Sequence, residues 1–169
     1  MADRYSPAKR SEIMSRIRGT GTKPEVRVRS LLHRLGYRFR LNRRDLPGRP
    51  DIILPRYRAA IFVHGCFWHR HSGCSKASLP ETNAEKWSVK LARNTERDRE
   101  NREALEEVGW RVATVWQCEL KDHQLVKYSL SQVLPDFAER VTARKRLPEL
   151  GSLDLESAIT ARSGVLERE

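Results

Sequence analysis

The strongest constraint on this chain is the stretch 64–74, where cysteine, histidine and aromatic side chains are concentrated. Its 11 residues hold three of the five histidines and two of the three cysteines, together with the adjacent aromatics Phe67 and Trp68. Cysteine and histidine at close spacing are typical metal ligands, and a hydrophobic core rarely uses them so densely. The apolar, partly β-branched run 59–63 predicts that the stretch begins where a strand ends. We therefore expect a metal-organised loop at a strand end.

The metal ligands form a complete set of four. Cys66, His71 and Cys74 follow one another within nine residues, and 43 residues separate Cys74 from Cys118. Three sulfurs and one nitrogen suit tetrahedral zinc, and a closed shell of four protein ligands is typical of a structural site. The alternative is three ordinary buried cysteines. A disulfide framework is not expected, because no signal peptide is visible and a cytosolic protein is implied.

The charge of the chain is unevenly distributed. The net charge is +11, and residues 1–49 contribute 14 Lys and Arg against 4 Asp and Glu. A basic N-terminal part indicates a polyanionic partner, most simply nucleic acid; the alternative is a basic surface without a specific partner. No run approaches the ~18 apolar residues of a membrane span. At 169 residues the chain is expected to be one domain with tails.

Helical and strand patterns alternate along the chain. Thr22 and Glu25 form a capping box that predicts a helix running to Gly36. Other helices are expected over 7–18, 84–107 (capped by Thr82 or Asn83) and 119–142 with a break at Pro135, and strands over 37–41, 51–54, 59–63 and 110–116. The short link between 51–54 and 59–63 predicts an antiparallel hairpin. The fold class is therefore α/β, a small mixed β-sheet flanked by helices.

Acid–base residues gather around the predicted hairpin. Asp51 opens one strand and His64 closes the next, as Asp and the Lys of Glu-x-Lys do in many metal-dependent nucleases, but Phe62 stands where the Glu is expected. His64 and His69 can act on a phosphate as charge donor, hydrogen-bond donor or general base. The ordinary alternatives are a turn residue and structural histidines. Candidate supporting carboxylates are Glu25 and Asp98.

These residues bring the chain close to one known family. The relevant motifs are LPGRPD at 46–51, FVHGCFWH at 62–69, His71, Cys74, NxERDR at 94–99 and GWRV to WxC over 109–118. In these motifs the chain resembles the very short patch repair endonucleases, and the match extends over residues 8–120. The His71-x2-Cys74 spacing is one residue longer than in a well-known member, a difference that a loop can absorb.

The resemblance implies a restriction-endonuclease-like core and an Mg²⁺-dependent enzyme. The family nicks one strand of double-stranded DNA 5′ of the thymine in a T:G mismatch, which arises when 5-methylcytosine deaminates. Asp51 and the backbone carbonyl of Val63 would bind Mg²⁺, and His69 would be the general base, oriented by Asp98. His64 would contact the scissile phosphate, and Glu25 would support the metal–water network.

The resemblance also implies the remaining functional parts. Cys66, His71, Cys74 and Cys118 would bind structural Zn²⁺. Phe67, Trp68 and Trp87 would insert beside the mismatch. The expected organisation is a basic DNA-contacting segment (1–21), a nuclease domain with the zinc site (22–142) and a C-terminal tail of unknown role (143–169).

The expected setting follows from the same resemblance. It is a cytoplasmic, nucleoid-associated bacterial monomer that works with mismatch-repair factors and a cognate cytosine-5 methyltransferase. Two other functions stay open, a restriction-type nuclease that cuts both strands and a zinc-stabilised DNA-binding module without catalysis.

Overall fold

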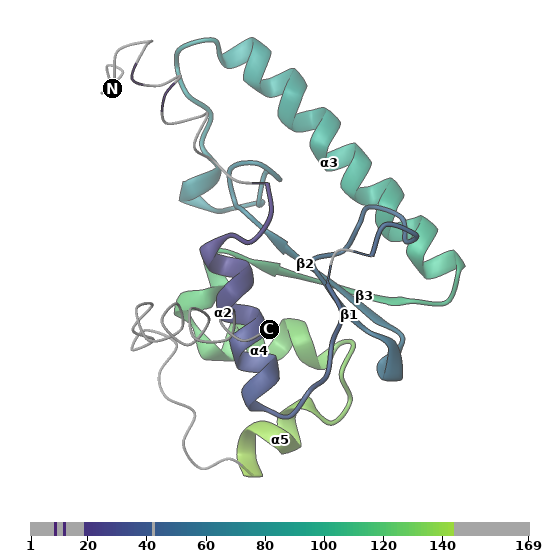
Figure 1. Ribbon diagram of the computed structural model, residues 1–169. Coiled ribbons are helices and arrows are strands. Elements are labelled where there is room, and N and C mark those ends of the chain that lie inside the picture. The colour runs from purple at the N-terminus through teal and green to yellow at the C-terminus, as the bar shows by residue number, and fades with distance from the viewer. Residues whose placement is uncertain (1–8, 10–11, 13–18, 42, 144–169) are drawn as a thin grey trace, which may run out of the picture.

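The computed structural model has a three-stranded sheet with helices on both faces (Figure 1). It describes residues 9, 12, 19–41 and 43–143. The helices and strands are α2 (Lys23–Arg34), β1 (Ile52–Leu54), β2 (Ala59–His64), α3 (Ala84–Glu107), β3 (Arg111–Trp116), α4 (His123–Ser131) and α5 (Phe137–Ala143). Three short 3-10 turns lie between them, at Pro55–Tyr57, Ser75–Ala77 and Glu119–Lys121. The predicted helix over 7–18, apart from residues 9 and 12, and the predicted tail 143–169, apart from its first residue, lie outside the described residues.

The sheet is mixed, as the sequence predicted. β1 and β2 form the expected antiparallel hairpin, with Ile52 opposite Ile61. β3 returns parallel to β2 after the long helix α3, and His64 lies opposite Trp116. Because Cys66 and Cys118 each follow these partners by two residues, the parallel register brings two distant cysteines to the same end of the sheet.

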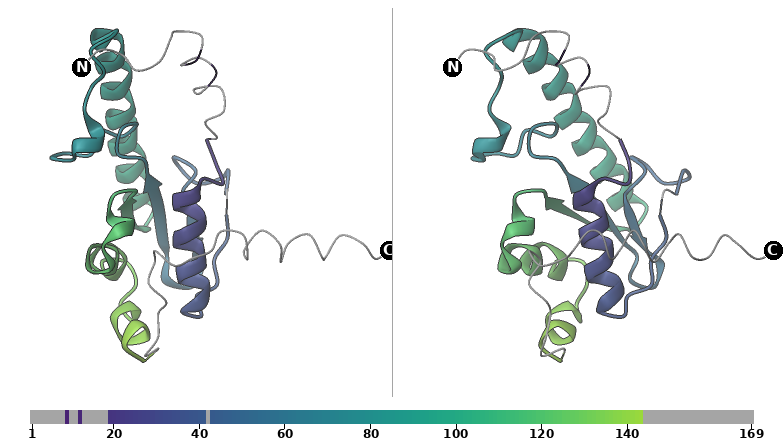
Figure 2. Two further views of the ribbon diagram at one scale, coloured as in Figure 1. Left: turned by 90° about the vertical axis from the view of Figure 1, so that its left-hand side faces the viewer. Right: turned by 60° about the vertical axis from the view of Figure 1, so that its left-hand side comes forward.

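Alternation along the strands separates two cores. The larger core joins α2, α4 and α5 to the sheet face that carries Ile61 and Val115. The smaller one joins Leu105 of α3 to the opposite face through Ile53 and Ala60. Residues at alternate positions share a face, so Asp51, Phe62 and His64 lie on the side of α3. Figures 1 and 2 show that α3 continues well beyond the edge of the sheet.

The capping box that starts α2 is confirmed. Thr22 accepts a hydrogen bond from the Glu25 backbone, the Glu25 side chain bonds back to the Thr22 N–H, and Gly36 follows the helix with a φ of 83°. The predicted cap of α3 is correct only in position. Asn83 precedes the helix, but its φ is 57° and its side chain makes no capping hydrogen bond.

The predicted strand over 37–41 is wrong. Only Arg40 pairs with the sheet, in a single bridge to Ile53. Tyr37 instead packs against Tyr57 and Phe137 and donates a hydrogen bond to Asp136 at 2.7 Å. Packing against α5 therefore overrides the alternating pattern, because it buries a large aromatic ring. The C-terminal pattern is helical as predicted and breaks before α5. Within the described part of the chain, no helix is long and apolar enough to span a membrane.

Candidate active site and metal centre

A cleft of about 1130 Å³ lies between the end of the sheet, the N-terminal end of α2 and the middle of α3. It contains the carboxylates and histidines that the sequence analysis selected from four separate segments. These are Glu25, Asp51, His64, His69 and Asp98. Asp51, His64 and Asp98 meet because strand alternation directs the first two to the sheet face that α3, which carries Asp98, covers.

Asp51 is anchored directly before the first residue of β1. Its Oδ2 accepts a hydrogen bond from the Val63 N–H at 2.8 Å. Burial, with a smaller contribution from the nearby charge of Glu25, raises the pKa of Asp51 to about 6, although the hydrogen bond from Val63 opposes the shift. The carboxylate is therefore costly to ionise without a cation beside it.

The Val63 carbonyl faces the same side as Asp51. The N–H and C=O of Ile53 bond to Arg40, on the side of β1 away from β2. The N–H and C=O of the preceding residue, Ile52, therefore face β2, where Ile52 pairs with Ile61. Alternate residues of a strand direct both backbone groups to the same neighbour, which places those of Val63 on the β1 side. The Val63 carbonyl and the Asp51 carboxylate therefore lie on the same side of β2, next to the start of β1.

His69 is held by Asp98 of α3. The His69 Nδ1 lies 2.5 Å from Oδ2 of Asp98, and both side chains are about one-fifth exposed (22% and 21%). A carboxylate only accepts hydrogen bonds, so Nδ1 carries the proton and Nε2 of a neutral ring is free to accept one. The structure thus brings together the base and orienting carboxylate suggested by the sequence.

His64 lies directly against His69. The two rings stack with centroids 3.8 Å apart and planes 9° apart. Burial, reinforced by the neighbouring His69, lowers the pKa of His64 to about 3. His64 is therefore neutral near pH 7, which disfavours the charge-donor role among the three that the sequence allowed and leaves hydrogen bonding or base chemistry.

Glu25 is buried and fully hydrogen-bonded. Its carboxylate accepts from the N–H groups of Gly21 and Thr22, from the Thr22 hydroxyl, and from Arg29 at 2.5 Å. It lines the cleft, and its negative charge acts on Asp51. In the free protein, however, the direct contacts of the Glu25 side chain cap α2 and hold the turn before it.

Cys66, His71, Cys74 and Cys118 converge on one point beside the cleft. Their ligand atoms all lie within 4.8 Å of one another, and the Cys118 Sγ is 3.2 Å from the His71 Nδ1. The Cys118–His71 separation is close to the spacing that a tetrahedral ion with bonds of about 2.0–2.3 Å requires. Burial and the neighbouring thiols raise the pKa of Cys118 to about 12. A cation is therefore the natural partner of this cluster, because it stabilises the thiolates.

Phe67, Trp68 and Trp87 form one aromatic cluster next to the cleft. The three rings make edge-to-face contacts with centroids 5.2–5.8 Å apart, and all three residues are half-buried. Lys90 lies over both indoles, at 5.6 and 5.4 Å from their centroids. The segment 66–70 is a series of turns and not extended, so the two neighbouring aromatics share a cluster instead of pointing apart.

Other residues that line the cleft were not predicted from the sequence. They include three arginines, Arg44, Arg49 and Arg97, and the polar residues Asn101 and Gln117. The concentration of Arg in 38–49 was a signal for the first two, but no periodicity distinguishes an arginine at a site from one in solvent.

Carboxylates and two histidines in one cleft, with arginines on its rim and a Cys3His cluster beside it, are an arrangement suited to hydrolysis of a phosphodiester bond. Comparison with known proteins makes this assignment specific. The family described as DNA mismatch endonuclease Vsr matches residues 2–76.

Three relatives match most of the chain. The type II nicking enzyme V.XorIIP of Xanthomonas oryzae pv. oryzae is 51% identical over 134 residues, which cover 79% of this chain and 98% of the relative. V.NmeAIP of Neisseria meningitidis is 40% identical over 141 residues (83% and 100%). The DNA mismatch endonuclease Vsr of Escherichia coli is 44% identical over 138 residues (81% and 88%). The chain belongs to the Vsr DNA mismatch endonuclease family and is a strand-nicking endonuclease.

Proposed function

We propose that this protein is an Mg²⁺-dependent endonuclease that nicks one DNA strand 5′ of the thymine in a T:G mismatch. The observation that carries the proposal is the single cleft that holds Asp51, His64 and the His69–Asp98 pair, with the aromatic cluster at its side. The printed name of the Escherichia coli relative, a mismatch endonuclease, supports the same substrate.

The oxygens of Asp51 and the Val63 carbonyl would hold Mg²⁺. Hard oxygen donors, with the remaining positions left to water and phosphate, are what this ion prefers. When bound, Mg²⁺ stabilises negative charge on the scissile phosphate and lowers the cost of deprotonating the attacking water. Its charge also removes the penalty that burial places on the ionised Asp51.

Proton transfer would fall to His69. Its Nε2 takes the proton of the attacking water, while Asp98 holds Nδ1 and stabilises the imidazolium that forms. Neutral His64, fixed in plane by stacking on His69, donates a hydrogen bond to a phosphate oxygen. Glu25 contributes indirectly, by holding the turn before α2 and by its charge near Asp51.

The Cys3His cluster would hold a structural Zn²⁺. Four protein ligands leave no position for substrate, so the ion ties the loop after β2 to the end of β3. Because His69 lies between Cys66 and His71, the same ion would fix the backbone of the proposed base.

Selection of the mismatch would come from the aromatic cluster. Rings that insert into a base step pay a cost of a few kcal/mol for unstacking, which is smallest where pairing is already faulty. Residues 1–21 would lie along the duplex and supply affinity independent of sequence. By family resemblance, deamination of 5-methylcytosine made by a cognate methyltransferase would supply the substrate for the nick, and mismatch-repair factors would act with it.

A second candidate is a nicking enzyme that recognises a fully paired site. The printed names of V.XorIIP and V.NmeAIP, which call them type II nicking enzymes, favour it. The two candidates can be distinguished with strand-labelled duplexes that carry one T:G pair, or a T:A pair in the same sequence context. Each duplex is incubated with the protein, with and without Mg²⁺. A nick confined to T:G with Mg²⁺ supports the proposal, and nicking of T:A supports the second candidate. A double-strand break would indicate a restriction-type nuclease, and an intact but shifted duplex would indicate a binding module.

A further inference from the structure

Three arginines on the rim of the cleft differ from their neighbours in having no acidic partner. Arg44 and Arg49 come from the loop before β1, and Arg97 comes from α3. Among the described residues, no carboxylate lies within ion-pair distance of them, and Arg97 contacts only the amide oxygen of Asn94, at 3.4 Å. These guanidinium groups are therefore available to an external anion.

Arginines next to them in sequence, but away from the cleft, are neutralised. Arg43 pairs with Asp45. Arg99 pairs with Glu96 at 2.5 Å and with Glu103 at 2.6 Å. The contrast between Arg43 and Arg44, and between Arg97 and Arg99, shows that positive charge is left unpaired on the cleft side of both segments.

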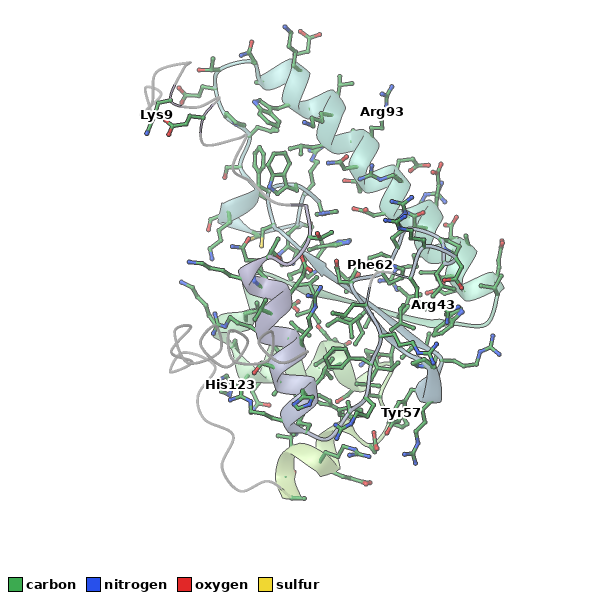
Figure 3. All side chains as sticks on the ribbon, viewed as in Figure 1. Lys9, Arg43, Tyr57, Phe62, Arg93 and His123 are labelled. Atoms are coloured by element: carbon green, nitrogen blue, oxygen red, sulfur yellow. The ribbon has the colours of Figure 1, made fainter. Side chains whose placement is uncertain are left out.

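The loop that carries Arg44 and Arg49 is docked closely on α3. A Cβ added to Gly48 would lie 2.7 Å from both Cβ and Cγ of Asn101, and Gly48 has a φ of 66°. Only glycine tolerates this approach and this backbone conformation without strain. Asn101 is four residues after Arg97, one helical turn, so the contact sets the two basic segments side by side. Figure 3 labels Arg43 of this loop and Arg93 of the same helix.

The backbone at Arg49 is also unusual. Its φ is 50°, in the left-handed region that non-glycine residues seldom adopt, and its N–H donates to the Leu46 carbonyl at 3.2 Å. Such conformations persist where the surrounding structure imposes them and cluster at functional sites. A tight turn next to the Gly48–Asn101 contact therefore fixes the backbone of Arg49, a residue that lines the cleft.

We propose that Arg44, Arg49 and Arg97 form a phosphate clamp that holds the DNA backbone next to the scissile bond. The cleft itself carries the carboxylates of Asp51 and Asp98, which repel a polyanion, so the rim must supply the compensating charge. Arginine suits this role because its planar guanidinium binds phosphate oxygens in pairs. The inference rests on the proposed function only in placing the cut strand in this cleft.

The first test compares Arg44→Ala and Arg49→Ala with Arg43→Ala and Arg99→Ala, which remove the same charge outside the cleft. DNA affinity is measured by fluorescence anisotropy over a range of salt concentrations on T:G and T:A duplexes. Each clamp variant should flatten the slope of log Kd against log salt by about 0.9, the value for one lost phosphate contact. The controls should leave the slope unchanged. Equal changes in all four variants would overturn the clamp.

The second test asks whether the loop must be docked. Gly48→Ala should weaken DNA binding although all three arginines remain, because the new Cβ pushes the loop from α3. Asn101→Gly removes the atoms that clash, so the double variant should recover a large part of the loss. Normal binding by Gly48→Ala, or a double variant no better than the single one, would refute docking as the cause.

The third test locates the phosphates. Neutral methylphosphonates are placed singly at the linkages flanking the nick, and single-turnover nicking is measured. At one of these linkages, the neutral group should lower the nicking rate or the DNA affinity of wild-type protein. The same group should not lower those of Arg49→Ala, because this variant has already lost the contact. Additive losses at every position would overturn the assignment. If wild-type protein nicks no T:G duplex, the proposed function fails, while the salt slopes still test the clamp.

Discussion

Replacing Asp51 with asparagine should make the protein more stable and inactive. Asparagine keeps the shape of the side chain and an oxygen that can accept the Val63 N–H, but it carries no charge. The pKa of Asp51 is raised from 3.8 to about 6, mainly by burial, which corresponds to a ceiling of about 3 kcal/mol. Because the side chain is partly exposed, we expect a gain in the free energy of unfolding of about 1–2 kcal/mol at pH 8.

The sign of the pH dependence follows from the direction of the shift. The folded state holds the Asp51 proton more tightly than the unfolded state, so this group's contribution to stability is complete below about pH 4 and is lost as the pH rises through about 6. The advantage of Asp51→Asn should therefore be near zero at pH 4 and complete above pH 7. Urea denaturation at several pH values measures it.

The assay needs two controls. Mg²⁺ should be removed by passing buffers over a chelating resin, because an added chelator would also strip the Cys3His cluster. Asp45→Asn is the matched substitution: Asp45 is exposed and its pKa is lowered by the hydrogen bond from Arg43, so no gain is expected. Added Mg²⁺ should stabilise the wild type and not Asp51→Asn. The reasoning is refuted if Asp51→Asn shows no gain at pH 8, or a gain that does not shrink toward pH 4.

Four further predictions address separate parts of the molecule. His69→Ala should lower the single-turnover nicking rate by roughly 10²–10⁴-fold with zinc content and T:G affinity retained; near-normal nicking would remove His69 as the base. Cys118→Ser should lose the one expected zinc per chain, by elemental analysis, and unfold at lower urea, whereas retained metal would contradict the assigned ligand. Trp68→Ala should reduce the ratio of T:G to T:A affinity more than it reduces T:A affinity itself, and equal losses would argue against a wedge. Asp136→Asn should cost about 1–3 kcal/mol of stability in urea without changing nicking, because Tyr37 donates to this carboxylate at 2.7 Å; a slower nicking rate would show that this network reaches the active site.

Local sequence signals determined most of the individual elements. The capping box of Thr22 and Glu25, the β1–β2 hairpin and the limits of α3 all follow from residues within one or two turns of each other. The same holds for Cys66, His71 and Cys74 in the loop, a group that could hold a metal ion, because their close spacing is itself the signal. These features were predictable because the interactions that produce them join residues that are close along the chain.

The tertiary structure decided which of those residues act together. The parallel register of β2 and β3 carries Cys118 to the loop, and packing of α3 across the sheet sets Asp98 against His69. Burial keeps His64 neutral, and the approach of Gly48 to Asn101 aligns two basic segments. Residue types and family resemblance suggested Cys118 and Asp98 as partners, but no spacing along the chain shows that these contacts form. Burial, pKa and charge pairing depend on groups that only the folded chain brings within a few ångströms of one another.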